Sequence, residues 1–127
     1  MITSYKEYSN IELSTEIMSA SGHRQIQLLI DKCLQHLQAA KIYIQEKQLT
    51  KKHEAIAKAL DILIYMRSIL NFKDQEAVAL STLLNTIYAA SEKSVTLANL
   101  KNDVSYLDHV ETALSQIKSG WDTIGQP

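Results

Sequence analysis

The stretch Leu97-Ala98-Asn99-Leu100-Lys101-Asn102-Asp103 separates two long segments of helical periodicity and decides how the chain folds. On both sides of it, apolar residues recur every three or four positions, which places them on one face of an amphipathic helix. These residues are Leu80, Leu84, Ile87, Tyr88, Val95 and Ala98 before the polar run, and Val104, Leu107, Val110, Leu114, Ile117 and Trp121 after it. Asn102 or Asp103 can cap the second helix, because a short side-chain oxygen reaches the free N–H groups of a first turn. A connection this short makes the two helices antiparallel.

Two more helical segments precede this hairpin. Ser21 and Thr50 stand directly before them, where N-cap residues are preferred. The four predicted helices cover residues 22–47, 51–70, 75–99 and 103–120. Since their connections are short, we expect an all-α fold: an antiparallel up-down-up-down four-helix bundle with a short N-terminal helix or cover segment.

The chain is expected to divide into an N-terminal cover or docking segment (residues 1–20), the helical bundle (residues 21–121) and a frayed tail (residues 122–127). Large apolar residues of the first part, such as Tyr5, Tyr8 and Ile11, alternate with serine, threonine and asparagine. A free tail seldom carries so many large apolar groups. The segment therefore either covers the end of the bundle or serves as a movable cover or docking peptide, and both readings stay open.

The composition fits one helical domain. The chain has 127 residues, of which 46% are hydrophobic, and its only proline is the last residue, so long helices can form. A net charge of -1 gives no support for nucleic-acid binding. No apolar run reaches the roughly 18 residues that membrane insertion needs, and the N-terminus lacks the pattern of a signal peptide. With Cys33 as the single cysteine, no internal disulfide forms, and we expect a cytoplasmic protein.

No set of residues predicts catalysis, a cofactor or a metal site. The histidines do not form the Glu-x-x-His pattern of di-iron bundles. There is no Gly-rich phosphate loop, Walker-type lysine or supported Ser-His-Asp arrangement. Cys33 falls on the apolar stripe of segment 22–47, where a small buried hydrophobe is the expected role. We therefore expect a protein that binds partners and is not an enzyme.

A helical adaptor or signalling bundle is the alternative function, and it includes a degenerate histidine phosphotransfer domain. Phosphotransfer domains are also four-helix bundles of about this size. They carry an exposed histidine that is followed three and four positions later by lysine and glycine. Neither His23 nor His36 has these neighbours in the sequence.

Several segments, in order and spacing, resemble the flagellar export chaperone family FliS. They are residues 18–31, which open the first long helix, segment 56–70, Leu84-x-x-Ile87-Tyr88 with residues 98–103, and the closing Ile117-Lys118-Ser119-Gly120-Trp121. The resemblance covers nearly the whole chain. Gly22 stands where the family usually has proline, and Ala90 replaces the second aromatic residue of its Tyr-x-Tyr.

The resemblance implies a chaperone that binds the C-terminal helical segment of flagellin, prevents its premature polymerisation and assists its delivery to the flagellar type III export apparatus. Such recognition lays a helix in a groove while the partner folds. It also implies that an aromatic residue at the place of Tyr5 or Tyr8 helps the loaded chaperone dock on the export-gate protein FlhA.

The residues expected to contact a partner are Tyr5, Tyr8, Ile11, Ile26, Leu29, Ile30, Ile87, Tyr88, Ala98, Asn99 and Asp103. For Asn99 and Asp103, partner contact and simple fixing of the hairpin are both open. The sequence also leaves open which helices line the groove, and whether the free protein forms a homodimer through an exposed apolar stripe.

Overall fold

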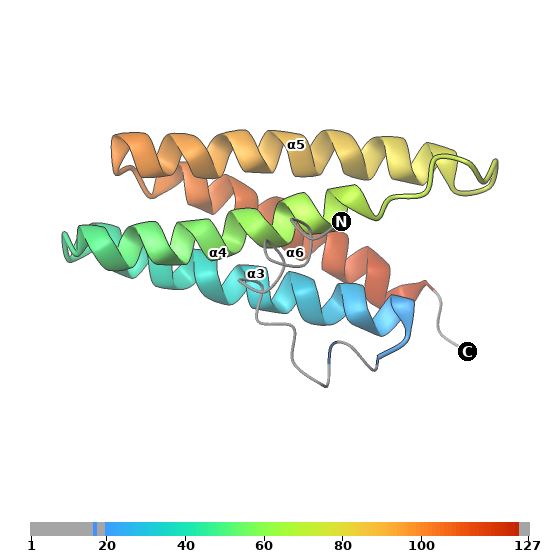
Figure 1. Cartoon of the computed structure of the whole chain (residues 1–127), viewed down its shortest axis with the longest axis horizontal. Helices are drawn as coiled ribbons and strands as arrows, with labels where there is room; N and C mark the ends of the chain where they lie inside the picture. Colours follow the sequence, from blue (N-terminus) through green and yellow to red (C-terminus); the bar gives the residue numbers. More distant parts are fainter. Residues whose placement is uncertain (1–16, 18–19, 125–127) are drawn as a thin grey trace, which may run out of the picture.

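Four long helices make up the part of the chain that the computed structural model describes, which is residue 17 and residues 20–124 (Figure 1). They are α3 (Gly22–Gln45), α4 (Leu49–Ser68), α5 (Val78–Lys101) and α6 (Ser105–Thr123). Each helix packs against the next, and α3 also packs against α6, which closes the ring. This confirms the predicted all-α, up-down-up-down four-helix bundle.

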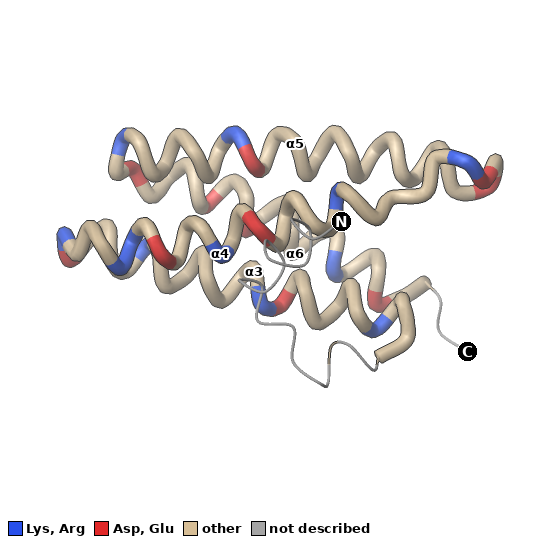
Figure 2. The backbone as a smooth tube through the Cα atoms, in the orientation of Figure 1, with Lys and Arg blue, Asp and Glu red and all other residues tan. Residues whose placement is uncertain are grey.

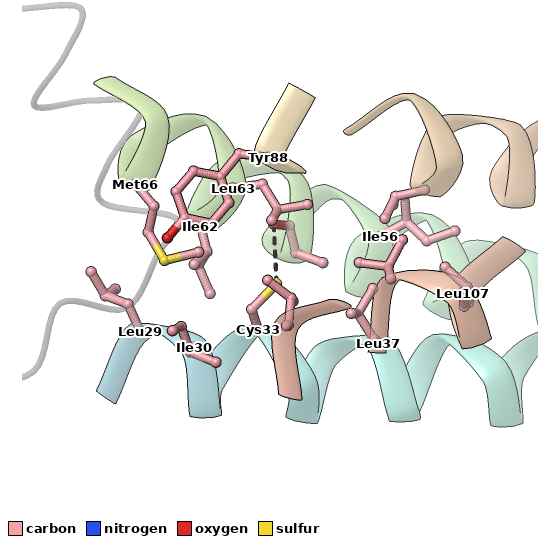
Figure 3. Packing of buried hydrophobic residues seen from close by; sticks show 14 of the residues in the cluster. Leu29, Ile30, Cys33, Leu37, Ile56, Ile62, Leu63, Met66, Tyr88 and Leu107 are labelled. Atoms are coloured by element: carbon pink, nitrogen blue, oxygen red, sulfur yellow. Dashed lines mark hydrogen bonds between the residues drawn. The ribbon is translucent and has the colours of Figure 1, made fainter. Parts of the chain in front are cut away.

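The core consists of one apolar stripe from each helix. Its fully buried members include Leu29, Ile30 and Leu37 of α3, Ile62 and Leu63 of α4, Val95 and Ala98 of α5, and Leu107 and Leu114 of α6. Figure 3 shows the α3 residues facing those of α4, with Tyr88 of α5 lying beside Met66. Burial of each large aliphatic side chain contributes about 1.5–3 kcal/mol to folding, so these stripes hold the four helices together.

The start of α3 agrees with the sequence, and its end explains a wrong prediction for α4. Ser21 caps α3 as predicted, and its Oγ accepts a hydrogen bond from the amide of Arg24 at 3.2 Å. Thr50 is not the N-cap of α4, because the helix begins one residue before it. The cause is a tight Schellman turn after α3, with Lys47 in the left-handed region at φ 57°. In that turn the amide of Gln48 donates to the carbonyl of Tyr43 at 2.9 Å.

The connection between α4 and α5 delays the start of α5 to Val78, three residues after the predicted start. The side-chain oxygen of Asn71 accepts hydrogen bonds from the amides of Lys73 and Asp74, at 3.0 and 3.2 Å. The Asp74 carboxylate in turn accepts from the amide of Glu76 at 2.9 Å. Short polar side chains thus satisfy the backbone amides in turns, and the helix begins only after them.

The α5–α6 turn lies at the end of the stretch of residues 97–103 that separates the two predicted helices. Asn102 adopts a left-handed conformation at φ 52° and ends α5, while Val104 occupies the N-cap position of α6. Neither Asn102 nor Asp103 is therefore the N-cap of α6. Instead, Asp103 accepts hydrogen bonds from the hydroxyl and the amide of Ser105, at 2.7 and 2.9 Å. These bonds stabilise the charged carboxylate and lower the pKa of Asp103.

A buried lysine from another helix holds the same turn. Lys52 of α4 is 2% exposed, and its Nζ donates to the carbonyl of Asn99 at 3.0 Å and to Oδ1 of Asn102 at 2.5 Å. The C-terminal end of α5 presents carbonyls that lack a partner within the helix, and it attracts a cation. The ammonium group of Lys52 supplies both the missing hydrogen-bond donor and the positive charge, and it thereby ties α4 to the α5–α6 hairpin.

Candidate functional site

Helix α5 carries two apolar stripes side by side. One enters the core through Leu84, Tyr88, Val95 and Ala98. The other consists of Leu80, Leu83, Ile87, Ala90 and Leu97, with the small polar Ser94 at the same spacing. Its steps of three and four residues repeat as in a coiled-coil seam. Leu80 and Leu83 are 42% and 57% exposed, whereas Ile87 and Leu97 are half-buried, so the described part of the chain leaves this second stripe partly uncovered and most open at its Leu80 end.

Helix α6 supplies the opposite wall. Its residues that line the same hollows are Tyr106, His109, Val110, Ala113, Gln116, Ile117, Gly120 and Trp121. The two hollows have volumes of about 510 Å³ each, and they share Ile87 and Ala113. The two hollows adjoin at these shared residues, and together we call them, between the second stripe of α5 and these residues of α6, the α5–α6 groove. From Leu80 to Leu97 it extends about 26 Å at the rise of an α-helix, which is room for a helix of roughly five turns.

A third hollow, also of about 510 Å³, adjoins the groove at the end of the bundle where α5 starts. We call it the end hollow. Its apolar lining includes Ile26 of α3, Met66 and Ile69 of α4, Leu80 and Leu84 of α5, and Trp121 and Ile124 at the end of the described chain. Because Leu80, Leu84, Trp121 and Ile124 line both spaces, the end hollow extends the groove.

Trp121 is held rigidly at the junction of the groove and the end hollow. Its ring stacks on His23 with centroids 5.2 Å apart and planes 9° apart. Its indole N–H donates to the His23 carbonyl at 2.9 Å, and Nε2 of His23 lies 2.7 Å from the Trp121 carbonyl. This reciprocal pair explains why α6 continues past residue 120, where we had expected it to end. It presents the tryptophan as a fixed apolar wall.

Ion pairs connect the helices on the other faces of the bundle. Lys41 of α3 contacts both Asp108 and Glu111 of α6, at 2.7 and 2.8 Å. Hydrogen bonds to these carboxylates raise the pKa of Lys41 above its ordinary value. Figure 2 shows that charge is sparse along α5, where Glu92 and Lys93 are the only charged residues before Lys101. The wall of the groove is therefore mainly apolar.

Three of the predicted partner residues lie at or near these hollows. Ile26 is half-buried and lines the end hollow, and Ile87 is half-buried and lines the groove. Tyr88 also borders the end hollow but is only 2% exposed. Burial disfavours its charged form and, with a smaller effect of Cys33, raises the pKa of Tyr88 to about 12.

The other predicted partner residues either do not line these hollows or lie outside the described residues. Leu29, Ile30 and Ala98 are 0% exposed and belong to the core. Asp103 accepts the hairpin bonds described above through its side chain, whereas Asn99 contributes only its backbone carbonyl, and its Oδ1 is buried without a hydrogen-bond partner. The remaining three, Tyr5, Tyr8 and Ile11, lie outside the described residues.

One described residue of the N-terminal segment is informative. Ile17 is 5% exposed and packs into the core cluster, and its carbonyl accepts a hydrogen bond from Nε2 of Gln25 at 3.2 Å. Ile17 thus contacts the bundle.

Sequence reasoning missed Leu83, Ala90 and Leu97 as candidate groove residues. A signal was present, because they continue the three-and-four spacing of Leu80 and Ile87 beside the core stripe. A helix with apolar residues on two adjacent faces needs two neighbours, and α6 covers only part of this surface.

Comparison with known proteins identifies the family. The model of the family described as flagellar protein FliS matches residues 4–127. The chain belongs to the FliS family. It is 33% identical over 121 residues to the flagellar secretion chaperone FliS of Vibrio cholerae, covering 95% of this chain and 88% of that protein. It is 32% identical over 119 residues to the flagellar secretion chaperone FliSB of Pseudomonas aeruginosa, with 94% and 93% covered.

A solved structure of a flagellar chaperone from bacteria has the same fold. Its TM-score is 0.74 at 14% identity, with 95% of this chain and 94% of that chain covered. The family match favours a chaperone over the adaptor or phosphotransfer alternative.

FliS chaperones are not a known enzyme class. Among the residues that the structure describes, no three or more His, Cys, Asp and Glu side chains group as metal ligands. Cys33 is 0% exposed, and its thiol donates to the Ala59 carbonyl at 3.7 Å (Figure 3). Burial raises the pKa of Cys33 well above its ordinary value, so this thiol is unreactive in the fold. In the same part of the chain, every helix is too short or too polar to cross a bilayer.

Proposed function

We propose that this FliS-family protein binds the C-terminal helical segment of flagellin in the α5–α6 groove. The observation that carries the proposal is the partly exposed second stripe of α5, which has coiled-coil spacing and lines the mainly apolar hollows between α5 and α6. A segment that polymerises through coiled-coil packing presents an apolar stripe of the same period. Laying that stripe in the groove buries both surfaces, as in other helix-in-groove complexes.

Occupation of the groove accounts for chaperone action. The bound stripe of flagellin is unavailable to other flagellin molecules, so polymerisation does not begin before secretion. Since the partner orders only on binding, the entropy of ordering weakens the complex and keeps it reversible at the export apparatus. Neither step needs catalysis or a cofactor.

The proposal includes the setting of the protein and its second partner. It acts in the cytoplasm, where flagellin is held before secretion. Residues 1–20 cover part of the groove or cap the bundle in the free state, and Tyr5 or Tyr8 docks the loaded chaperone on FlhA. Dimerisation of the free protein through the same exposed stripe would compete with flagellin.

Co-expression with the cognate flagellin, followed by size-exclusion chromatography, tests the proposal. We expect a soluble 1:1 complex and suppressed polymerisation. Leu83→Glu should weaken the complex at least tenfold, because full burial of a leucine side chain is worth about 1.5–3 kcal/mol and a carboxylate resists burial. Ile64→Glu is the matched control, since Ile64 is 43% exposed on α4 and lines neither the groove nor the end hollow.

Two results contradict the proposal. In one, flagellin elutes apart from the wild-type chaperone and polymerises at its normal rate. In the other, Leu83→Glu binds flagellin as tightly as wild type, which would show that flagellin does not bind in the groove.

A further inference from the structure

The acidic side chains of α5 and α6 all point away from the α5–α6 groove. Glu92, the only acidic residue of α5, pairs with Arg67 of α4 at 2.8 Å. On α6, Asp108 and Glu111 both pair with Lys41 of α3. These contacts draw three carboxylates toward α3 and α4.

Charged side chains at the C-terminal end of α6 are also directed toward α3. Asp122 accepts a hydrogen bond from Nε2 of Gln27 of α3 at 2.7 Å. Lys118 pairs with Asp31 of α3, so this cation is also turned away from the groove. As a result, among the described residues no Asp or Glu lines the groove or the end hollow. This exclusion occurs in a chain that has 14 acidic residues against 13 basic ones.

One hollow of the groove is lined by a lysine and a histidine. Lys93 of α5 and His109 of α6 are both exposed and line the same hollow from opposite sides. Within the described ranges, neither makes an ion pair or a hydrogen bond. Tyr106 lines the same hollow, and Lys101 lies over its ring, 5.6 Å from the centroid. This end of the groove therefore offers the positive charge of Lys93 and the N–H donors of Lys93 and His109, and no described Asp or Glu lines it.

The opposite end of the groove has a different character. Leu80 and Leu83, both exposed, stand there beside Ile117 and Trp121. From Leu83 to Lys93 the distance along α5 is ten residues, or about 15 Å. The groove thus differs along its length: the exposed leucines and Trp121 lie at one end beside the polar Gln116, and Lys93 and His109 lie at the other.

We propose that the groove recognises a helix that carries a carboxylate about ten residues from a large apolar anchor. The anchor lies against Leu83 and Trp121, and the carboxylate accepts hydrogen bonds from Lys93 and His109. The inference rests on the proposed function and adds what fixes the register and direction of the bound segment. Apolar contacts at a regular three-and-four spacing tolerate a slip of one repeat, whereas a single charged contact does not.

Charge reversal in the full-length protein tests this inference, with purified monomeric cognate flagellin as the probe. Exposed ion pairs are weak, so we expect Lys93→Glu and His109→Glu each to raise the Kd about fivefold at low salt. The loss should shrink at high salt, because salt screens exposed charges. Lys51→Glu makes the same charge change on the exposed face of α4, away from the groove, and should leave the Kd unchanged. Equal thermal unfolding of all variants shows that the fold is intact.

Rescue gives the sharper readout. Acidic residues in the C-terminal segment of flagellin are changed one at a time to lysine, and we expect one of these changes to restore binding to Lys93→Glu while weakening binding to wild type. If flagellin binds wild type and both charge-reversal variants equally, the inference is overturned and the proposed function stands. If wild type does not bind flagellin at all, both are overturned.

Discussion

Replacing Lys52 by methionine should destabilise the bundle, although it removes a charge from the interior. The ammonium group of Lys52 is the donor that joins α4 to the carbonyl of Asn99 and the side chain of Asn102. Methionine fills a similar volume but donates nothing. Both acceptors then lose their partner; the Asn99 carbonyl belongs to a half-buried residue, whereas the exposed Asn102 side chain can bind water instead.

The magnitude follows from two opposing contributions. Each hydrogen bond to a charged group is worth about 1.5–3 kcal/mol, which gives roughly 3–6 kcal/mol for the two bonds. The wild type also carries the cost of removing an ammonium group from water, several kcal/mol in a buried site, which offsets much of this gain. We expect a net loss of about 2 kcal/mol in the free energy of unfolding. For a chain of this length that lowers Tm by roughly 6–10 °C.

Urea and thermal unfolding, followed by far-UV circular dichroism, measure this loss. Lys51→Met is the matched control, because Lys51 is the exposed neighbour of Lys52 and only lies over the ring of Tyr43, 5.9 Å from its centroid. The control should change the free energy of unfolding by no more than about 1 kcal/mol. Wild-type or higher stability of Lys52→Met would refute the reasoning, since the buried lysine would then not hold the hairpin.

Three further predictions concern tyrosine side chains and the cysteine. The pKa of Tyr88 is raised from 10.0 to about 12, so the stability from its neutral form is complete below pH 10 and is lost as the pH rises toward 12. The difference in tyrosinate absorbance between wild type and Tyr88→Phe should show a step near pH 12, and a step near pH 10 would count against burial. Cys33 should react with a thiol reagent only on unfolding, and reaction at the rate of a free thiol would show that the core opens. Joint replacement of Tyr5 and Tyr8 by alanine should reduce flagellin export and leave Tm nearly unchanged, whereas a large fall in Tm would assign these residues to capping the bundle.

The four helices were predictable from the sequence because their apolar stripes are long and regular. The ends of the helices were less predictable, because local hydrogen bonds determine where each helix begins and ends. Lys47 adopts a left-handed conformation that favours glycine. Because residue 47 is a lysine, its residue type did not predict the tight turn that shifts the start of α4. Asn71 and Asp74 were visible as turn residues, but which amides they satisfy depends on the folded turn.

The candidate site was only partly predictable. Ile26 and Ile87 came from the family resemblance, and the structure places both at open hollows. Leu29 and Ile30 came from the same reasoning but point into the core. Periodicity reveals that α5 has two apolar faces, yet it does not tell which face α6 covers. That choice is made by the packing of all four helices, so Leu83 became a candidate only in the folded bundle.

Site-specific photo-cross-linking is the measurement that tests the central claim most directly. A photoreactive residue is placed at position 83 in the α5–α6 groove, or at position 64 on the exposed face of α4, and the chaperone is mixed with cognate flagellin. Binding in the groove predicts a cross-link from position 83 to the C-terminal segment of flagellin and none from position 64. A cross-link from position 64 with none from position 83 would contradict the account.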